Sequence, residues 1–300
     1  MITDSGQRVA LKSAVDSQFP VESSDLISVS SLIHPSPSPR IRIHADVGRY
    51  RLRLAESIED REAACRLRFS VFNIEMGEGL EASYQTGLDA DQFDLFCDHL
   101  LVEDKMQGDL ASRVVGTYRM QSGTTAAHNL GYYSEQEFNF APYEPLRPGI
   151  LELGRASIHR EHRTPEVLTL LWRGIAQYAN DMELRYLIGC SSIPSQNPAD
   201  GWELYRLLEH YRVSPEFETL TNPAYACVAE RGAAQEHEPK AEPAAVKVPK
   251  LLKTYLAIGA RIAAPPAWDR EFGTIDFLTL LDLKLLSSSA RNRFLTPLAR

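Results

Sequence analysis

The chain has 300 residues, 44% of them hydrophobic, and its 40 acidic and 32 basic side chains give a net charge of −8 at pH 7. This composition suits one large domain or two small ones and excludes a fibrous or wholly disordered chain. Nucleic-acid binding normally requires a basic face, so the acidic balance argues against a nucleic-acid partner. The cysteines form no CxxC pair, which predicts neither a disulfide framework nor a zinc knuckle. Without a signal-peptide pattern or a run of about 18 apolar residues, a cytoplasmic location is expected.

Composition divides the chain into four stretches. Residues 1–48 include a Ser/Pro-rich run and are predicted to be a disordered tail. Residues 49–230 are dense in apolar positions and are predicted to form the folded domain. Residues 231–250 contain Ala, Glu, Lys and Pro without an aromatic residue, which predicts a flexible linker. The apolar segment 251–300 is expected to complete the domain.

Strand and helix patterns are mixed within the dense stretch. The helix starts are the clearest signals: Ser57 precedes two acids, and Thr164 precedes a proline and an acid. The predicted elements in chain order are a strand at 51–54, a helix from 57, a hairpin of 99–105 with 112–120, a strand at 150–158, a helix from 164 to about 181, a strand at 185–193, a helix at 200–211 and an extended segment at 217–229. Such a mixture predicts an α/β or α+β domain, with a mixed central sheet flanked by helices and a C-terminal extension.

Acidic residues accumulate between Glu75 and Asp98, where seven acids occur without a lysine or arginine. This unneutralised charge predicts a loop that attracts a cationic ligand. A solvated acidic loop is the alternative. An EF-hand is disfavoured because Asp89, Asp91 and Asp94 lack the glycine and distal glutamate of a calcium loop.

Arginines accumulate between Arg147 and Arg173, again without a lysine. Arg160 and Arg163 come just before the helix start at Thr164, where unpaired backbone N–H groups also favour an anion. These two arginines are therefore predicted to bind a phosphate, with pairing to surface acids as the alternative. The same positive charge repels metal ions from neighbouring histidines, and no metal site is predicted.

The segment Leu151-Glu152-Leu153-Gly154-Arg155 combines a carboxylate and a guanidinium in one predicted strand. In a regular strand, Glu152 and Arg155 would point to opposite faces. A bulge at Gly154 would direct both into one cleft and leave backbone N–H groups free for an oxyanion. An ordinary strand with an ion pair is the alternative.

Taken together, these motifs resemble the ornithine-lipid N-acyltransferases, sometimes labelled hemolysin-like, of the GNAT superfamily. The matching segments are Leu67 to Phe72, Glu75 to Gly77, Asp89 to Asp94, Cys97 to Leu100, Val115 to Arg119, Leu151 to Arg155, Leu171 to Ile175, Gly189 to Ser192 and Tyr255 to Ala260. The layout is also similar to that of acyl-homoserine-lactone synthases. Those enzymes carry a tryptophan shortly after the motif matched by Arg68 and Phe72, whereas this chain has Met76-Gly77 and no nearby tryptophan.

The resemblance implies a GNAT-like sheet and a set of site residues. The positions matching the acceptor and acyl-thioester site are Arg68, Phe72, Asp89, Asp91, Asp94, Arg119, Glu152 and Arg155. Glu152 is expected to act as the base, through a water or directly, and Arg155 to order the site beside the bulge. Arg160 and Arg163 are expected to meet the phosphate of phosphopantetheine.

The implied reaction transfers a fatty, 3-hydroxy acyl group from acyl-carrier protein to the α-amine of an amino acid, L-ornithine in this family, giving a lyso-ornithine lipid. No cofactor is expected, because the 4'-phosphopantetheine of the carrier belongs to the substrate. Two alternatives stay open: an acyl-homoserine-lactone autoinducer synthase, and a non-catalytic protein that binds acyl carrier or lipid. The run Leu278 to Leu286 fits either a buried final strand or transient contact with the surface of the inner membrane.

Overall fold

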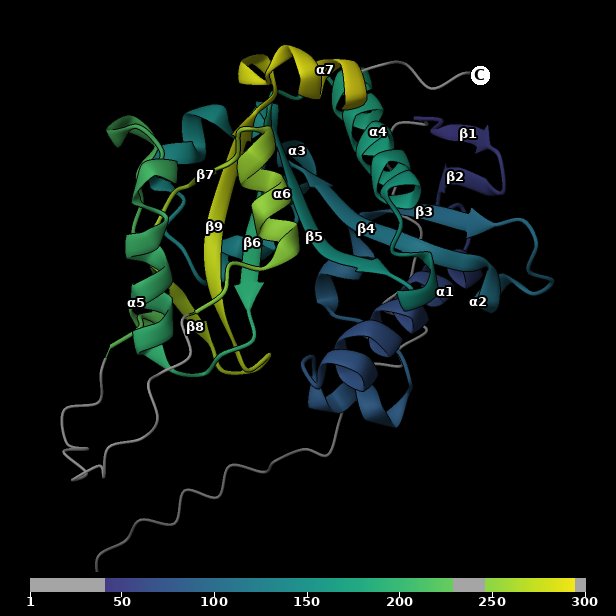
Figure 1. Cartoon of the computed structure of the whole chain (residues 1–300), viewed down its shortest axis with the longest axis horizontal. Helices are drawn as coiled ribbons and strands as arrows, with labels where there is room; N and C mark the ends of the chain where they lie inside the picture. Colours follow the sequence, from purple (N-terminus) through teal and green to yellow (C-terminus); the bar gives the residue numbers. More distant parts are fainter. Residues whose placement is uncertain (1–40, 229–245, 295–300) are drawn as a thin grey trace, which may run out of the picture.

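The computed structural model describes residues 41–228 and 246–294 (Figure 1). Within these ranges, nine strands form one sheet in the order β1-β2-β3-β4-β5-β6-β9-β7, and β8 pairs with β9. β5 and β6 are parallel, and the other pairs are antiparallel. The strands are His44–Val47 (β1), Tyr50–Leu54 (β2), Asp98–Asp104 (β3), Val114–Ser122 (β4), Ile150–Ile158 (β5), Tyr186–Ile193 (β6), Arg261–Ile262 (β7), Ala267–Asp269 (β8) and Thr274–Asp282 (β9). This mixed sheet with flanking helices confirms the predicted fold class.

The helices begin where the sequence signals predict. The Ser57 hydroxyl accepts a hydrogen bond from the Asp60 N–H, and Thr164 caps the helix that starts at Pro165 in the same way. The helices are Ile58–Phe69 (α1), Leu110–Arg113 (α2), Gly123–His128 (α3), Pro165–Asp181 (α4), Pro198–Leu207 (α5), Lys250–Ile258 (α6) and Ser288–Phe294 (α7), with a π-helix at Ser70–Met76 (η2) and short 3-10 helices that include Gln92–Leu95 (η4), Tyr133–Gln136 (η5) and Arg160–His162 (η7).

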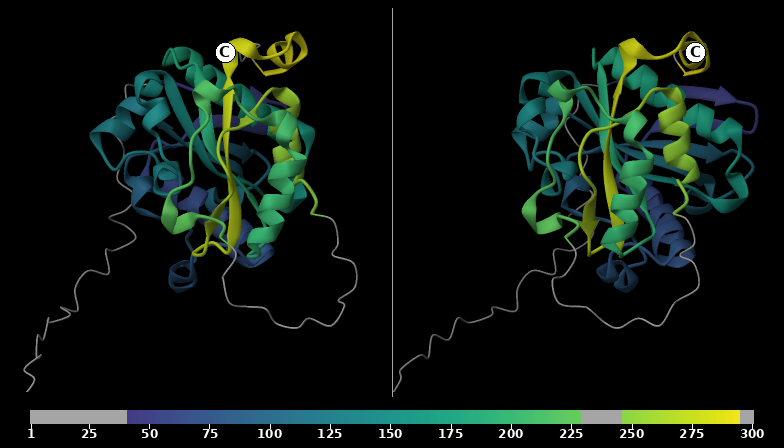
Figure 2. Two further views of the ribbon diagram at one scale, coloured as in Figure 1. Left: turned by 90° about the vertical axis from the view of Figure 1, so that its left-hand side faces the viewer. Right: turned by 60° about the vertical axis from the view of Figure 1, so that its left-hand side comes forward.

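Helices cover both faces of the sheet (Figure 2). Successive residues of β3 face opposite layers of helices. Leu100 packs into one core with Leu171 of α4, whereas Leu101 packs into another core with Leu67 of α1. α6 and α7 join the α4 layer. The sheet is therefore buried on both sides, which fits the apolar character of β3, β4 and β9.

The C-terminal segment supplies a central strand. β9 pairs with β6 along its length, from Tyr186 opposite Asp282 to Ile193 opposite Ile275. Leu278, Leu280 and Leu281 are buried in this sheet. For the part of the run Leu278 to Leu286 that lies in β9, the alternative of a buried strand is therefore correct and that of membrane contact is wrong. No helix in the described ranges combines the length and apolar character needed to cross a bilayer.

Two predicted boundaries are wrong where the structure describes them. Residues 44–47 of the predicted tail form β1, because Ile41, Ile43, Ala45 and Val47 alternate with polar residues and pack on the α4 core. Residues 246–250 of the predicted linker belong to the fold, since Val246 and Val248 pack against a core cluster. Residues 1–40, 229–245 and 295–300, with the rest of the predicted tail and linker, lie outside the described residues.

β5 carries a bulge and separates from β6 partway along. Arg119 pairs with Gly154 and Thr117 with Ser157, so Tyr118 faces two residues of β5. The bulge was predicted at Gly154 and lies one residue later, at Arg155, whose φ is +52°. Beyond Glu152, β5 no longer pairs with β6.

Gly189 of β6 lies against β5 at the point of separation. A Cβ added to Gly189 would stand 2.2 Å from the carbonyl oxygen of Leu153. We expect Gly189→Ala to lower the free energy of unfolding by about 1–3 kcal/mol, because the backbones would have to move apart. Urea unfolding measures the loss. Gly149→Ala is the control, since its Cβ would meet nothing within 4 Å, and an equal loss in both variants would contradict the prediction.

Candidate active site

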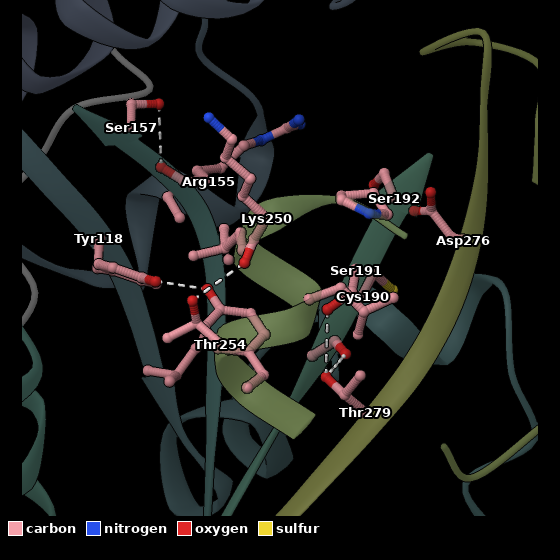
Figure 3. A pocket seen from close by; sticks show the side chains of 18 of the residues that line it. Tyr118, Arg155, Ser157, Cys190, Ser191, Ser192, Lys250, Thr254, Asp276 and Thr279 are labelled. Carbon is pink, nitrogen blue, oxygen red and sulfur yellow. Dashed lines mark hydrogen bonds between the residues drawn. The ribbon is translucent and has the colours of Figure 1, made fainter. Parts of the chain in front are cut away.

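A pocket of about 1410 Å³ opens where β5 and β6 separate (Figure 3). It is lined by β4, β5, β6 and β9 and by the segment that leads into α6. Among the predicted site residues, those that line it are Phe72, Arg119, Glu152, Arg155 and Arg163. Arg68, Asp89, Asp91, Asp94 and Arg160 are not among the lining residues.

Arg68 of α1 forms the centre of a buried ion-pair network. Its side chain is fully buried and binds both carboxylate oxygens of Asp94, at 2.8 and 2.9 Å. Its Nε donates to Asp89 at 2.8 Å. A bidentate pair of this kind fixes the guanidinium in orientation as well as position. Burial opposes ionisation of Asp94, but the charges of Arg68 and Arg119 outweigh it and lower the pKa of Asp94 well below its usual value.

Asp91 connects the network to the pocket. Its two carboxylate oxygens accept hydrogen bonds from Arg119 at 2.6 Å and from Arg155 at 2.9 Å. The Asp91 side chain also caps η4 by accepting from the Phe93 N–H. Arg119 of β4 and Arg155 of β5 therefore reach the pocket wall with their orientation fixed from behind.

The acidic-loop prediction is wrong for the three aspartates of this network. Asp89, Asp91 and Asp94 pair with Arg68, Arg119 and Arg155. These arginines come from α1, β4 and β5, far away in the sequence, so a local count of charges could not include them. The aspartates position arginines instead of offering free negative charge to a ligand.

Glu152 lines the pocket and is held by the start of η5. Its carboxylate accepts hydrogen bonds from the Tyr133 N–H at 2.9 Å, the Ser134 N–H at 2.8 Å and the Ser134 hydroxyl at 2.7 Å. Burial raises the pKa of Glu152, and these donors oppose the shift. A carboxylate has about four acceptor positions, so one remains for a substrate proton or a water.

Glu152 and Arg155 do not pair with each other. Both side chains line the pocket, as predicted for a strand with a bulge between them. The Arg155 guanidinium lies 4.1 Å from the centre of the Phe272 ring and 5.3 Å from the centre of the Tyr133 ring. The alternative of an ordinary strand with an internal ion pair does not describe β5.

The two arginines predicted to bind phosphate are separated. Arg163 lies at the pocket beside Thr164 and Pro165, and it forms a two-bonded ion pair with Glu75, one bond of which measures 2.8 Å. Arg160 is exposed in η7 and does not line the pocket.

Several further residues line the pocket that are not among the predicted site residues. Lys247, Lys250 and Lys253 line its α6 edge and are exposed. Their spacing of three residues was the available signal, and the boundary placed after residue 250 divided it between the predicted linker and the C-terminal segment. On another side lie Glu78, Cys190, Ser192 and Asp276. Burial raises the pKa of Glu78 to about 7, with a contribution from Asp276.

Because the ion-pair network is buried, removing one of its charges should lower the free energy of unfolding. Arg68→Met would leave Asp89 and Asp94 without their main partner, and unpaired buried charges of this kind cost about 3–5 kcal/mol. We expect a loss of that size in urea unfolding. Arg66→Met, at an exposed position of the same helix, should change stability by no more than about 0.5 kcal/mol. Similar effects at both positions would contradict a special role for the network.

Comparison with known proteins identifies relatives. Residues 67–173 match the acetyltransferase (GNAT) domain family. The chain is 34% identical over 253 residues to the L-ornithine N(alpha)-acyltransferase of Brucella abortus (strain 2308), covering 81% of this chain and 87% of that protein. The enzyme of the same name from Rhizobium meliloti (strain 1021) is 32% identical over 247 residues, with coverages of 81% and 83%.

The solved structures that match the chain are more distant in sequence. FeeM, an N-acyl amino acid synthase from uncultured soil microbes, gives a TM-score of 0.47 at 11% identity, covering 83% of this chain and 97% of that one. The acyl-homoserine-lactone synthase LasI gives 0.45 at 12% identity, with coverages of 84% and 98%. The sequence relatives decide the assignment and confirm the resemblance: the chain is an N-acyltransferase and belongs to the family of L-ornithine N(alpha)-acyltransferases.

Proposed function

We propose that this chain transfers a 3-hydroxy fatty acyl group from acyl-carrier protein to the α-amine of L-ornithine, giving a lyso-ornithine lipid. The acceptor follows from the relatives, which are named L-ornithine N(alpha)-acyltransferases. The observation that carries the proposal is the pocket between β5 and β6, which joins a polar wall containing Glu152 to an apolar and basic wall beside α6.

The α6 side of the pocket suits an acyl donor bound to an acidic carrier. Apolar side chains from α4, β6 and β9, among them Leu168, Leu187 and Leu281, line the space that would hold the acyl chain. Exposed cations surround its edge: Arg163, Lys247, Lys250, Lys253 and Arg293. Acyl-carrier proteins are acidic, so opposite charge would guide docking and bring the phosphopantetheine phosphate to this edge. Arg163 lines the pocket, which supports its predicted contact with the phosphopantetheine phosphate. Arg160 does not line the pocket, which favours a role in docking the carrier protein over direct contact with the phosphate.

The chemistry needs a base and alignment. The ammonium of the amino acid gives a proton to Glu152, and the free amine attacks the thioester carbonyl carbon. A C–N bond forms, the C–S bond breaks, and the thiol leaves with a proton. Because a thioester has a good leaving group, no covalent enzyme intermediate is required, and most of the acceleration comes from orientation and proton removal. Arg155 and the bulge hold the pocket wall beside the reacting atoms.

The proposal is tested by product analysis. Purified protein is incubated with 3-hydroxyacyl carrier protein, or with the same acyl group on coenzyme A, and with a panel of free amino acids. We expect mass spectrometry to detect mainly N-acyl ornithine, formed faster from the carrier-bound donor. Higher turnover with the coenzyme A thioester would contradict the proposal that acyl-carrier protein is the donor. An acyl-homoserine-lactone product would contradict the proposal that L-ornithine is the acceptor. Donor binding without any product would favour the non-catalytic alternative.

The role of Glu152 makes a separate prediction. Glu152→Gln removes the proton acceptor, so we expect kcat to fall about 100-fold or more, with little change in KM for the acyl donor. Glu161→Gln, at an exposed position, is the control. Retention of near-normal kcat in Glu152→Gln would exclude Glu152 as the base.

Ser134→Ala separates the base role from a structural one. The Ser134 hydroxyl lowers the pKa of Glu152, so its removal should raise that pKa. Glu152 must be ionised to act, and the acidic limb of the kcat profile should therefore move to higher pH. Ser112→Ala, outside the pocket, should leave the profile in place. An unmoved or oppositely moved limb in Ser134→Ala would contradict the assignment.

A further inference from the structure

A second group of acids lies on the same side of the sheet as Glu152. Cys190 of β6 and Asp276 of β9 line the pocket, and Figure 3 shows Asp276 beside Ser192, its partner in the β6–β9 register. Glu137 follows η5 and completes the group. One carboxylate oxygen of Glu137, one of Asp276 and the sulfur of Cys190 lie within 4.8 Å of one another.

Glu137 has no partner for its charge among the described residues. It is 1% exposed and forms no ion pair there, and the neighbouring Cys190 thiol, which can donate to its carboxylate, carries no positive charge. Asp276 is 4% exposed and accepts a hydrogen bond from the Thr274 hydroxyl at 3.0 Å. Burying a carboxylate without a cation is costly. Burial and the charges of Asp276 and Asp269 raise the pKa of Glu137 well above its usual value, and burial raises that of Asp276 to about 6.

This arrangement contrasts with the buried network on the other side of Glu152. There, every aspartate has an arginine of the chain within ion-pair distance. Glu137 and Asp276 have none in the described ranges, although Asp276 lines the pocket. A cation that enters through the pocket would supply the missing charge.

The group is joined to the proposed base by a short chain of polar contacts. The Cys190 thiol donates to the Ser134 hydroxyl at 3.4 Å, and that hydroxyl donates to Glu152 at 2.7 Å. A molecule whose amine lies at Glu152 would therefore have its other end near Glu137 and Asp276. A diamino acid carries a second ammonium at that end.

A metal ion fits the group less well. Cysteine binds metals as the thiolate. The Cys190 thiol donates a hydrogen bond to the Ser134 hydroxyl, and a metal ion would have to displace that proton and break the bond. Two carboxylates and a neutral thiol suit an organic ammonium better.

We propose that Glu137 and Asp276 bind the side-chain ammonium of the amino-acid acceptor and so select a diamino acid over an acceptor with a neutral side chain. This inference rests on the proposed function and deepens it, because it names the residues that distinguish ornithine. Cys190 and Ser134 lie between this ammonium site and the base.

The experiment compares L-ornithine with L-norvaline, which has the same carbon chain without the terminal amine. The wild type should prefer ornithine in kcat/KM. Glu137→Gln and Asp276→Asn should each reduce kcat/KM for ornithine about 100-fold, as loss of a buried charge partner does, while acylation of norvaline is retained. Glu271→Gln changes an exposed carboxylate in the turn before β9 and should preserve the preference for ornithine.

The outcomes are distinguishable. If the wild type acylates no ornithine, the proposed function fails and this inference fails with it. If the wild type prefers ornithine and both variants keep that preference, the inference alone fails. A stoichiometric zinc ion in the purified enzyme, together with loss of activity on chelation, would overturn it in favour of a metal site.

A wild-type measurement covers the case in which the variants do not fold. In a crystal structure with L-ornithine, the side-chain nitrogen should lie within about 3.2 Å of carboxylate oxygens of Glu137 and Asp276. A side-chain nitrogen elsewhere in the pocket would overturn the proposal.

Discussion

The ion-pair network of Arg68, Asp94, Arg119, Asp91 and Arg155 is the interaction on which the geometry of the pocket depends. It connects α1, η4, β4 and β5, four segments that share no local sequence signal. Arg155 has a left-handed backbone, which costs a residue with a side chain about 1–2 kcal/mol. Its bond to Asp91 and its contact with the Phe272 ring oppose that cost and keep the bulge in place.

Buried ion pairs are a poor source of net stability, since desolvation cancels most of their attraction, and apolar side chains of similar volume often do as well. We therefore interpret the network as a device for placement. The carboxylates of the network fix two guanidinium groups at the pocket wall, and the Tyr133 ring lies 5.5 Å from Arg119 and 5.3 Å from Arg155. Tyr133 in turn begins η5, whose N–H groups hold Glu152. The position of Glu152 is thus linked to residues that never reach the pocket.

Local signals predicted the elements of this fold better than its charge pairing. The caps at Ser57 and Thr164 act over a few positions, and the structure has both helices where the sequence places them. β1 was missed although Ile41, Ile43 and Ala45 alternate, because a Ser/Pro-rich run precedes them. Neutralisation of the aspartates required arginines 21 to 66 residues away, as in Arg68–Asp89 and Asp89–Arg155.

The site was predictable only where its residues belong to one motif. Glu152 and Arg155 are three positions apart, and the need for a bulge followed from strand geometry alone. Glu137, Cys190 and Asp276 come from three segments separated by more than 50 residues each, so no spacing could bring them together.

The two groups of acids show how one chain uses negative charge in two ways. Asp89, Asp91 and Asp94 are compensated within the protein, because an arginine lies within ion-pair distance of each carboxylate. Glu137 and Asp276 form no ion pair among the described residues, and their pKa values are raised. The free-energy cost of burying these carboxylates is offset only when a ligand supplies the opposite charge. The binding free energy therefore depends on the identity of the acceptor. An acceptor without that charge would have to leave the carboxylates protonated or unpaired, and this difference in free energy is a physical basis for selectivity.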